Sequence, residues 1–81
     1  MTDPCELLPG STYRSASGAL LWFDADYVEY RHEGLSEIYD WRCREGEIQF
    51  REGRFASDLE LHGDRELVWL GVTYMLERRR E

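Results

Sequence analysis

The sequence predicts an all-β protein, a single small antiparallel meander of about eight short strands that close into a barrel. Seven glycines recur along the chain and divide it into short segments. Within these segments apolar and polar residues alternate with the two-residue period of a half-buried strand, and a helical period of apolar residues is hard to find. Frequent turns between alternating segments are typical of a meander in which each strand pairs with the next.

The length allows one domain. With 81 residues, 42% of them hydrophobic, the chain can bury one small core. We divide it into an N-terminal segment at 1–9, a barrel domain at 10–78 and a tail at 79–81. A single helical turn is expected near 3–8, where Pro4 can occupy the first helical position.

Turn residues place the strands. We expect them at about 12–17, 20–23, 27–32, 36–44, 47–51, 55–62, 66–70 and 72–78. Asp24 and Asp26 supply the turn after the second strand. Gly71 marks a bulge or sharp bend before the last strand, because the inward-facing residues change there from odd-numbered to even-numbered positions.

The middle hairpins can be paired residue by residue. A two-residue turn at 45–46 gives one apolar face and one face of complementary charge. Its opposed pairs are Arg44–Glu47, Cys43–Ile48, Arg42–Gln49, Trp41–Phe50 and Asp40–Arg51. A turn at 52–53 then sets Phe50 opposite Phe55, although it also sets Arg51 opposite Arg54. A three-residue turn at 63–65 gives the pairs Leu61–Leu67, Leu59–Trp69 and His62–Glu66.

This alternation predicts a filled aromatic core. The inward-facing residues are Phe23, Val28, Tyr30, Tyr39, Trp41, Ile48, Phe50, Phe55, Leu59, Leu61, Leu67, Trp69, Val72, Tyr74 and Leu76. A small barrel of short strands is filled by its own side chains. A pocket for a small apolar ligand is the alternative.

The order of several motifs resembles the lipocalin-like small barrels. The motifs are Gly10…Tyr13, Leu21-Trp22-Phe23-Asp24-Ala25-Asp26, Tyr39-Asp40-Trp41, Gly46-Glu47-Ile48, the Leu-rich segments 58–61 and 66–70, and Glu77-Arg78. Tyr27 stands where that family usually has Gly, so the turn before it must differ. The resemblance covers residues 10–78 and implies an antiparallel barrel without a common activity.

Composition excludes several classes of protein. The chain has no Lys and no Asn, which excludes a P-loop lysine, Lys-based catalysis and N-glycosylation. Its longest apolar run, 18–23, is too short to span a membrane, and acidic residues 1–10 do not form a signal peptide. Cys5 and Cys43 match no metal spacing, so we expect two reduced thiols in a cytoplasmic protein.

No motif indicates catalysis, and we expect a non-enzyme without catalytic residues, cofactor or metal. No Ser lies in a Gly-x-Ser-x-Gly nucleophile elbow, and His32 and His62 fall on outward or strand-end positions. Asp24, Asp26 and Glu29 could ligate a hard cation, but solvation of a turn explains these acids equally well.

The formal net charge of −7 belongs almost entirely to one half of the chain. Residues 1–40 carry eight acids and two Arg, whereas 41–81 carry nine acids and eight Arg. An acidic surface repels nucleic acid and attracts basic proteins. The Arg run at 78–80 lies between Glu77 and Glu81, and we interpret it as a solvated tail.

Four large apolar residues, Trp22, Val68, Leu70 and Met75, are expected to face outward. They form a contiguous apolar patch, or they pack beneath the N-terminal segment through 7–9. The sequence leaves both alternatives open.

Taken together, these features predict a non-enzymatic protein-binding module. We expect an acidic inhibitor or immunity-type protein of bacterial or phage origin, for example an anti-defence protein, that binds a basic partner and neither nucleic acid nor membrane. The expected partner-binding residues are Trp22, Asp24, Asp26, Tyr27, Glu29, Glu33 and Glu37. The alternatives are a lipocalin-like carrier of a small hydrophobic ligand and a homo-oligomeric structural protein, including a homodimer through an edge strand.

Overall fold

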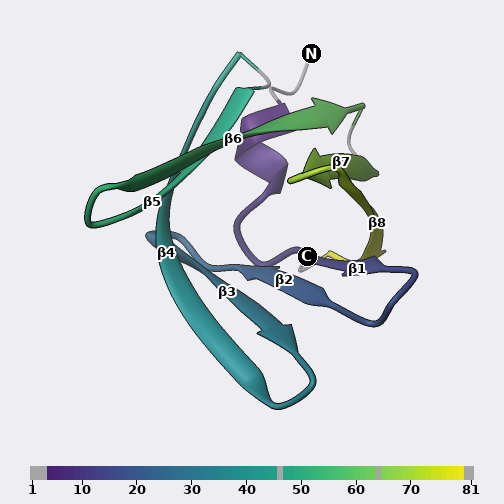
Figure 1. Ribbon diagram of the computed structural model, residues 1–81. Helices are drawn as coiled ribbons and strands as arrows, with labels where there is room; N and C mark the ends of the chain where they lie inside the picture. The colour runs from purple at the N-terminus through teal and green to yellow at the C-terminus, as the bar shows by residue number, and fades with distance from the viewer. Residues whose placement is uncertain (1–3, 46, 64, 80–81) are drawn as a thin grey trace.

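The computed structural model describes residues 4–45, 47–63 and 65–79. A short 3₁₀ turn, η1 (Pro4–Leu7), precedes a closed barrel of eight antiparallel strands in sequence order (Figure 1). The strands are β1 (Thr12–Ser15), β2 (Leu20–Phe23), β3 (Tyr27–His32), β4 (Leu35–Arg44), β5 (Glu47–Glu52), β6 (Phe55–His62), β7 (Glu66–Trp69) and β8 (Val72–Arg78). The predicted all-β antiparallel barrel is confirmed, and each strand lies within two residues of its expected bounds.

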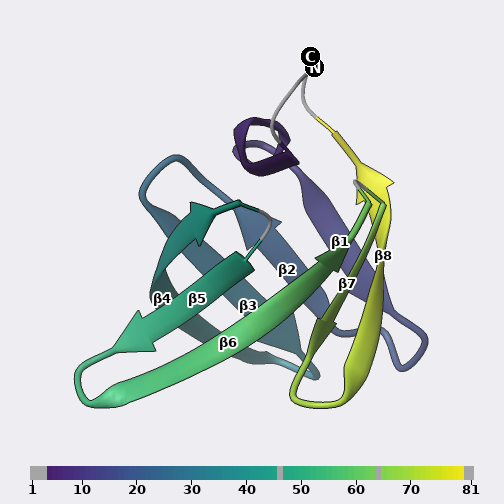
Figure 2. The same cartoon turned by 90° about the horizontal axis from the view of Figure 1, so that it is seen from above.

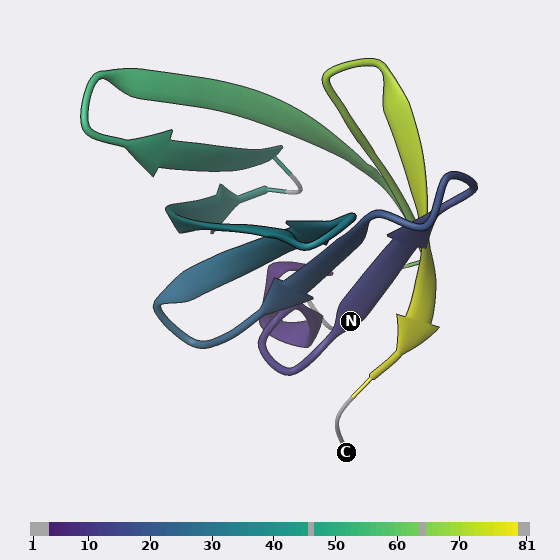
Figure 3. The same ribbon diagram turned by 60° about the horizontal axis from the view of Figure 1, so that its bottom comes forward.

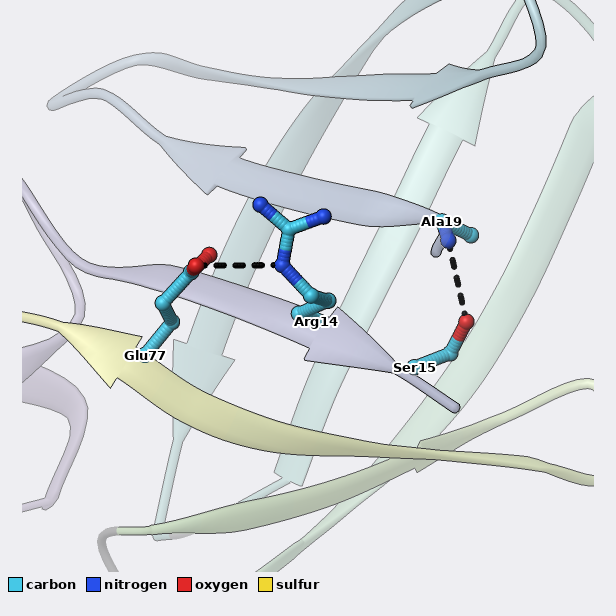
Figure 4. Close-up of polar contacts among 4 residues, drawn as sticks. All are labelled: Arg14, Ser15, Ala19 and Glu77. Carbon is cyan, nitrogen blue, oxygen red and sulfur yellow. Dashed lines mark hydrogen bonds and ion pairs between the residues drawn. The ribbon is translucent and has the colours of Figure 1, made fainter. Parts of the chain in front are cut away.

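Pairing of β8 with β1 closes the barrel. The register shifts between Thr12 and Tyr13, which oppose Arg78 and Leu76, so a β-bulge lies at the closure. The Arg14 Nε donates a hydrogen bond to the Glu77 carboxylate at 3.1 Å across this seam (Figure 4). Closure leaves no described strand at a sheet edge, so a homodimer through an edge strand would first require two strands to separate.

Tight hairpin turns depend on positive φ angles. Glu33 and Gly34 have φ of 50° and 83°, and Leu70 and Gly71 have φ of 52° and 77°, as a type I′ turn requires. Gly71 is therefore part of the hairpin turn between β7 and β8. Of the two predicted alternatives, a bulge or a sharp bend, the sharp bend is confirmed. Leu70 lies in this turn instead of ending the preceding strand.

The β4–β5 hairpin has the predicted register, from Asp40 opposite Arg51 to Arg44 opposite Glu47. Gly46 lies outside the described residues. The predicted β5–β6 register is wrong by two residues. Phe50 opposes Ser57, and Arg51 opposes Ala56.

The β5–β6 turn consists of Gly53 and Arg54, and Gly53 takes the positive φ of 57°. Placing Gly at the first turn position is favourable, and the shift also avoids an Arg51–Arg54 pair. Its consequence is that Phe55 moves to the end of the barrel.

The predicted pairs Leu61–Leu67 and His62–Glu66 of the β6–β7 hairpin are confirmed, and the ladder continues to Glu60–Val68. It contains no Leu59–Trp69 pair among the described residues. Residue 64 of the predicted three-residue turn lies outside the described residues.

Aromatic rings fill the interior. Phe23 contacts Phe50 at a centroid distance of 5.8 Å, and Phe50 contacts Trp69 at 5.1 Å and Tyr39 at 5.9 Å. Most of the predicted inward residues are buried or packed against this core. Phe55 and Val72 are exceptions, at 42% and 41% exposure, because they lie at hairpin tips beyond the core.

The N-terminal segment closes one end of the barrel. Leu8, Tyr13 and Leu21, absent from the predicted inward set, are fully buried. The expectation of two reduced thiols is wrong, because Cys5 of η1 forms a disulfide with Cys43 of β4, with a Cα–Cα distance of 5.5 Å. Burial of Leu8 brings Cys5 to the barrel wall, where Cys43 lies on the inward-facing side of β4.

The described part of the C-terminal Arg run folds back on the barrel. Arg79 Nη2 donates to the Tyr13 hydroxyl at 3.3 Å, and Arg79 Nε donates to Ser11 Oγ at 3.4 Å. For Arg79 the expectation of a solvated tail is therefore wrong. Residues 80–81 lie outside the described residues.

Candidate partner-binding face

The strands β1, β2, β3 and β4 lie side by side, and β1–β3 are seen together in Figure 3. Their outward residues form two rows across the strands. These rows, which we call the outer face, are Thr12–Trp22–Glu29–Ile38 and Arg14–Leu20–Arg31–Ser36. Four of the predicted partner-binding residues lie on or beside it: Trp22, Asp24, Tyr27 and Glu29.

Trp22 is the aromatic side chain that the outer face exposes, at 38%. Its ring meets Tyr27 edge to face with a centroid distance of 6.0 Å. A hydrogen bond to Asp24 raises the pKa of the Tyr27 hydroxyl. Asp24 is fixed in turn, because Trp41 Nε1 donates to its carbonyl at 2.8 Å. The structure thus brings Trp22, Tyr27 and Asp24 together at one end of the outer face.

Glu29 occupies the centre of the outer face and holds a fixed negative charge. Its side chain is 16% exposed. Arg31 Nε and Ser36 Oγ donate to its carboxylate at 2.9 and 2.6 Å. These hydrogen bonds, that from Arg31 first, lower the pKa of Glu29. The carboxylate therefore stays ionised and oriented next to Trp22, its neighbour across β2 and β3.

A groove of about 300 Å³ runs along this face, lined by Thr12, Leu20, Trp22, Glu29 and Arg31. A second hollow of about 430 Å³ continues over the β3–β4 turn and shares Leu20, Glu29 and Arg31 with the first. The groove has an apolar floor, one aromatic wall and a charged centre. This composition suits a peptide or a protein surface, because it combines an anchor for an apolar side chain with an orienting charge.

The remaining predicted site residues lie outside the two rows of the outer face. Asp26 borders a separate hollow together with Asp40 and Arg42. Glu33 lies in the β3–β4 turn beside His32, where it lines the second hollow. Glu37 lies on the same inward-facing side of β4 as Tyr39 and accepts a hydrogen bond from the Tyr39 hydroxyl at the end of the barrel. Sequence position alone therefore grouped residues that the barrel separates.

The outer surface of β4–β6 intersperses opposite charges, as does the outer face, where Arg31 pairs with Glu29 and Arg14 pairs with Glu77. Arg51 opposes Asp40 across β4 and β5, and Gln49 Nε2 donates to Asp58 at 3.2 Å. Arg42 and Arg44 line a hollow there together with Glu47 and Glu60. The acidic excess of residues 1–40 therefore comes from acids outside the two rows of the outer face, among them Asp24, Asp26, Glu33 and Glu37.

The four residues expected outside do not form one patch. Trp22 lies near the β2–β3 turn, whereas Leu70 lies in the β7–β8 turn. Met75 is separated from Leu20 by Arg14 of β1. Trp22, Leu70 and Met75 are exposed, so the N-terminal segment does not cover them.

Six residues of the outer face were not predicted from the sequence: Thr12, Arg14, Leu20, Arg31, Ser36 and Ile38. The alternation of β3 places Arg31 on the same side as Glu29, two residues away, which was a usable signal. Ile38 lies next to Glu29 only through the β3–β4 register, and a single-strand pattern does not reveal that neighbour.

Neither a cluster of metal ligands nor a membrane-spanning helix occurs in the described part of the chain. Within the described ranges, no three His, Cys, Asp or Glu side chains converge as metal ligands. The same part of the chain contains no helix with the length and apolarity to cross a bilayer. Comparisons with protein-family models, curated proteins and solved structures found no match for the chain.

Proposed function

We propose that this protein is a non-enzymatic binding module that docks a basic protein through the outer face of β1–β4. The observation that carries the proposal is the exposed indole of Trp22 beside the fixed, ionised Glu29. An aromatic anchor next to an oriented charge is the composition of an interface hot spot. The acidic excess of residues 1–40 adds long-range attraction for a basic partner.

The role that suits such a module is inhibition. A small acidic protein can cover the basic surface of a bacterial enzyme, toxin or defence component and so compete with its substrate. The touching rings of the core support this role over a carrier of a hydrophobic ligand. The closed ring of strands gives less support to a homo-oligomer built through strand edges.

The compartment proposed differs from the cytoplasm expected from sequence. A disulfide such as Cys5–Cys43 persists in oxidising environments and is rare in cytosolic proteins. We therefore place the inhibitor and its target in an oxidising compartment. Thiol labelling of protein isolated under non-reducing conditions from its native host should find both cysteines blocked, and free thiols would argue for the cytoplasm.

The docking proposal is tested by salt-dependent capture followed by affinity measurement. Immobilised protein should retain a basic partner at about 50 mM salt and release it at about 500 mM, where charges are screened within a few ångströms. Trp22→Ala should weaken the affinity for that partner at least about thirtyfold, as for other aromatic hot spots. Glu29→Gln should weaken it and reduce the salt dependence.

Two matched variants serve as controls. Met75→Ala removes an exposed apolar side chain from β8, and Glu60→Gln removes an acid from the charge-balanced surface of β6. Both should bind like the unchanged protein. Retention that does not depend on salt, or equal losses with Met75→Ala and Trp22→Ala, would contradict the proposal.

A further inference from the structure

One end of the barrel carries exposed apolar side chains on its hairpin tips. Four hairpin turns lie at this end, and η1 lies at the other (Figure 2). Leu35 begins β4, Phe55 begins β6, Leu70 lies in the β7–β8 turn and Val72 follows it. We call these four residues the apolar rim. All of them are exposed, so none is explained by packing inside the barrel.

Leu70 is the most informative residue of the rim. Its backbone has φ of 52° and its side chain is 68% exposed. A left-handed conformation is unfavourable for a bulky residue and is normally given to Gly, Asn or Asp. At equivalent positive-φ turn positions the chain places exposed Glu33 and Glu45, with φ of 50° and 54°. A leucine at position 70 therefore stabilises neither the turn nor the core. A conflict of this kind between a residue and its local structure marks a functional position.

The rim surrounds a rigid aromatic base. Phe55 contacts Tyr39 at a centroid distance of 5.7 Å, and Tyr39 contacts Trp69 at 5.7 Å. Trp69 is paired in turn with Val72 across the β7–β8 hairpin. Aromatic side chains held by a core lose little conformational entropy when a partner binds. Phe55 is thus preorganised by the packing beneath it.

Carboxylates among the tips define the charge of a suitable occupant. Glu33, Glu37 and Glu52 are exposed at this end, where Arg54 is the described basic residue of the β5–β6 turn. Burial, the hydrogen bond to Glu37 and the charges of Glu37 and Glu52 raise the pKa of Tyr39, which places both carboxylates near the aromatic base. Such a surface repels anionic lipid and a second copy of this acidic chain.

We propose that the apolar rim is a second docking surface, separate from the outer face, for an amphipathic basic segment of another protein. Apolar side chains of that segment contact Phe55, Leu70 and Val72. Its Lys or Arg side chains lie against Glu33, Glu37 and Glu52. This surface does not depend on the outer-face proposal, because it shares no residue with the two rows of the outer face. Glu33 and Leu35 also line the hollow over the β3–β4 turn, but Phe55, Leu70 and Val72 lie apart from it.

The test uses Leu70→Asn, which gives the turn a residue that it prefers. The probe is a synthetic amphipathic helix of Leu and Lys, titrated calorimetrically. We expect Leu70→Asn to fold at least as stably as the unchanged protein and to bind the peptide at least about tenfold more weakly. Glu45→Asn makes the same change at a turn beside η1 and should leave the affinity unchanged.

Further measurements distinguish the proposed basic segment from other occupants of the apolar rim, such as a lipid surface or a second copy of the chain. A peptide with Glu in place of Lys should bind poorly, and neutral phosphatidylcholine vesicles should not retain the protein. The proposal is overturned if Leu70→Asn leaves peptide affinity intact, or if vesicles retain the protein and the peptide does not bind. It is equally overturned if the affinity falls with Trp22→Ala instead, or if Leu70→Asn abolishes a dimer seen by sedimentation.

Discussion

The indole N–H of Trp69 is a polar group buried in the aromatic core, and it is satisfied by one serine. Trp69 Nε1 donates to Ser57 Oγ at 3.0 Å, and both residues are buried. Ser57→Ala should lower the free energy of unfolding by about 1–2 kcal/mol, because the N–H would lose its partner in a dry environment. Urea denaturation measures this change.

Ser57→Thr is the matched control for the hydroxyl. It keeps the acceptor and adds a β-branch that strands accept, so it should retain more stability than Ser57→Ala. Equal losses in the two variants would show that packing, and not the hydrogen bond, determines the effect.

The alternation that turns Leu59 and Leu61 inward places Ser57 on the same side, but it does not predict what the hydroxyl binds. That partner depends on the approach of β6 to β7 and on the β5–β6 register, which the sequence pattern placed two residues away. At the candidate site the same limit holds. Trp22 and Glu29 were recognisable as outward residues, whereas the hydrogen bond from Ser36 to Glu29 required the β3–β4 ladder.

Hairpins were predictable as elements where turn chemistry and strand alternation agreed. The β4–β5 register followed from one apolar and one charged face, and the structure has that register. At β5–β6, both Glu52-Gly53 and Gly53-Arg54 are acceptable turns that keep the same inward parity. A two-residue shift leaves every side chain on its face, so alternation could not decide between them.

The disulfide fastens η1 to β4, and its contribution belongs to these two elements. Cys5 and Cys43 are 38 residues apart. Closing a loop of that length reduces the entropy of the unfolded chain and stabilises the fold by about 4 kcal/mol in the chain-entropy treatment. We expect the Cys5→Ser/Cys43→Ser variant to lose up to about this amount of unfolding free energy in urea, since strain and residual structure reduce the effect.

Two further measurements identify the source of that loss. The unchanged protein under reducing conditions should match the double variant. Hydrogen exchange in the variant should accelerate first at residues near η1, because the covalent link to the wall is lost there. A double variant as stable as the oxidised protein would contradict a disulfide that stabilises the N-terminal segment.

At the scale of the whole molecule, closure of the barrel determines contacts between distant segments that the sequence pattern does not predict. The pairing of β1 with β8 joins the ends of the barrel domain, and Leu8 then enters the core. Only this closed arrangement brings Cys5 to Cys43, so their separation along the chain gave no indication of a bond. The apolar rim likewise arises because the antiparallel order collects four hairpin turns at one end.

Buried tyrosines link the stability of the whole barrel to alkaline pH. Burial raises the pKa of Tyr74 from 10.0 to about 12, and burial followed by the hydrogen bond to Glu37 raises the pKa of Tyr39. Because each folded pKa lies above the unfolded value, this stability is fully present below about pH 10 and is lost as pH rises through the folded pKa.

The loss attributable to Tyr74 is about 2–3 kcal/mol, at 1.36 kcal/mol per pKa unit. We expect the urea midpoint to fall between about pH 10 and 12, and to fall less steeply in Tyr74→Phe, because that variant has no hydroxyl to ionise on unfolding. Denaturation curves at a series of pH values measure both slopes. If Tyr74→Phe and the unchanged protein lose stability equally across this range, the Tyr74 hydroxyl is not held neutral by the barrel.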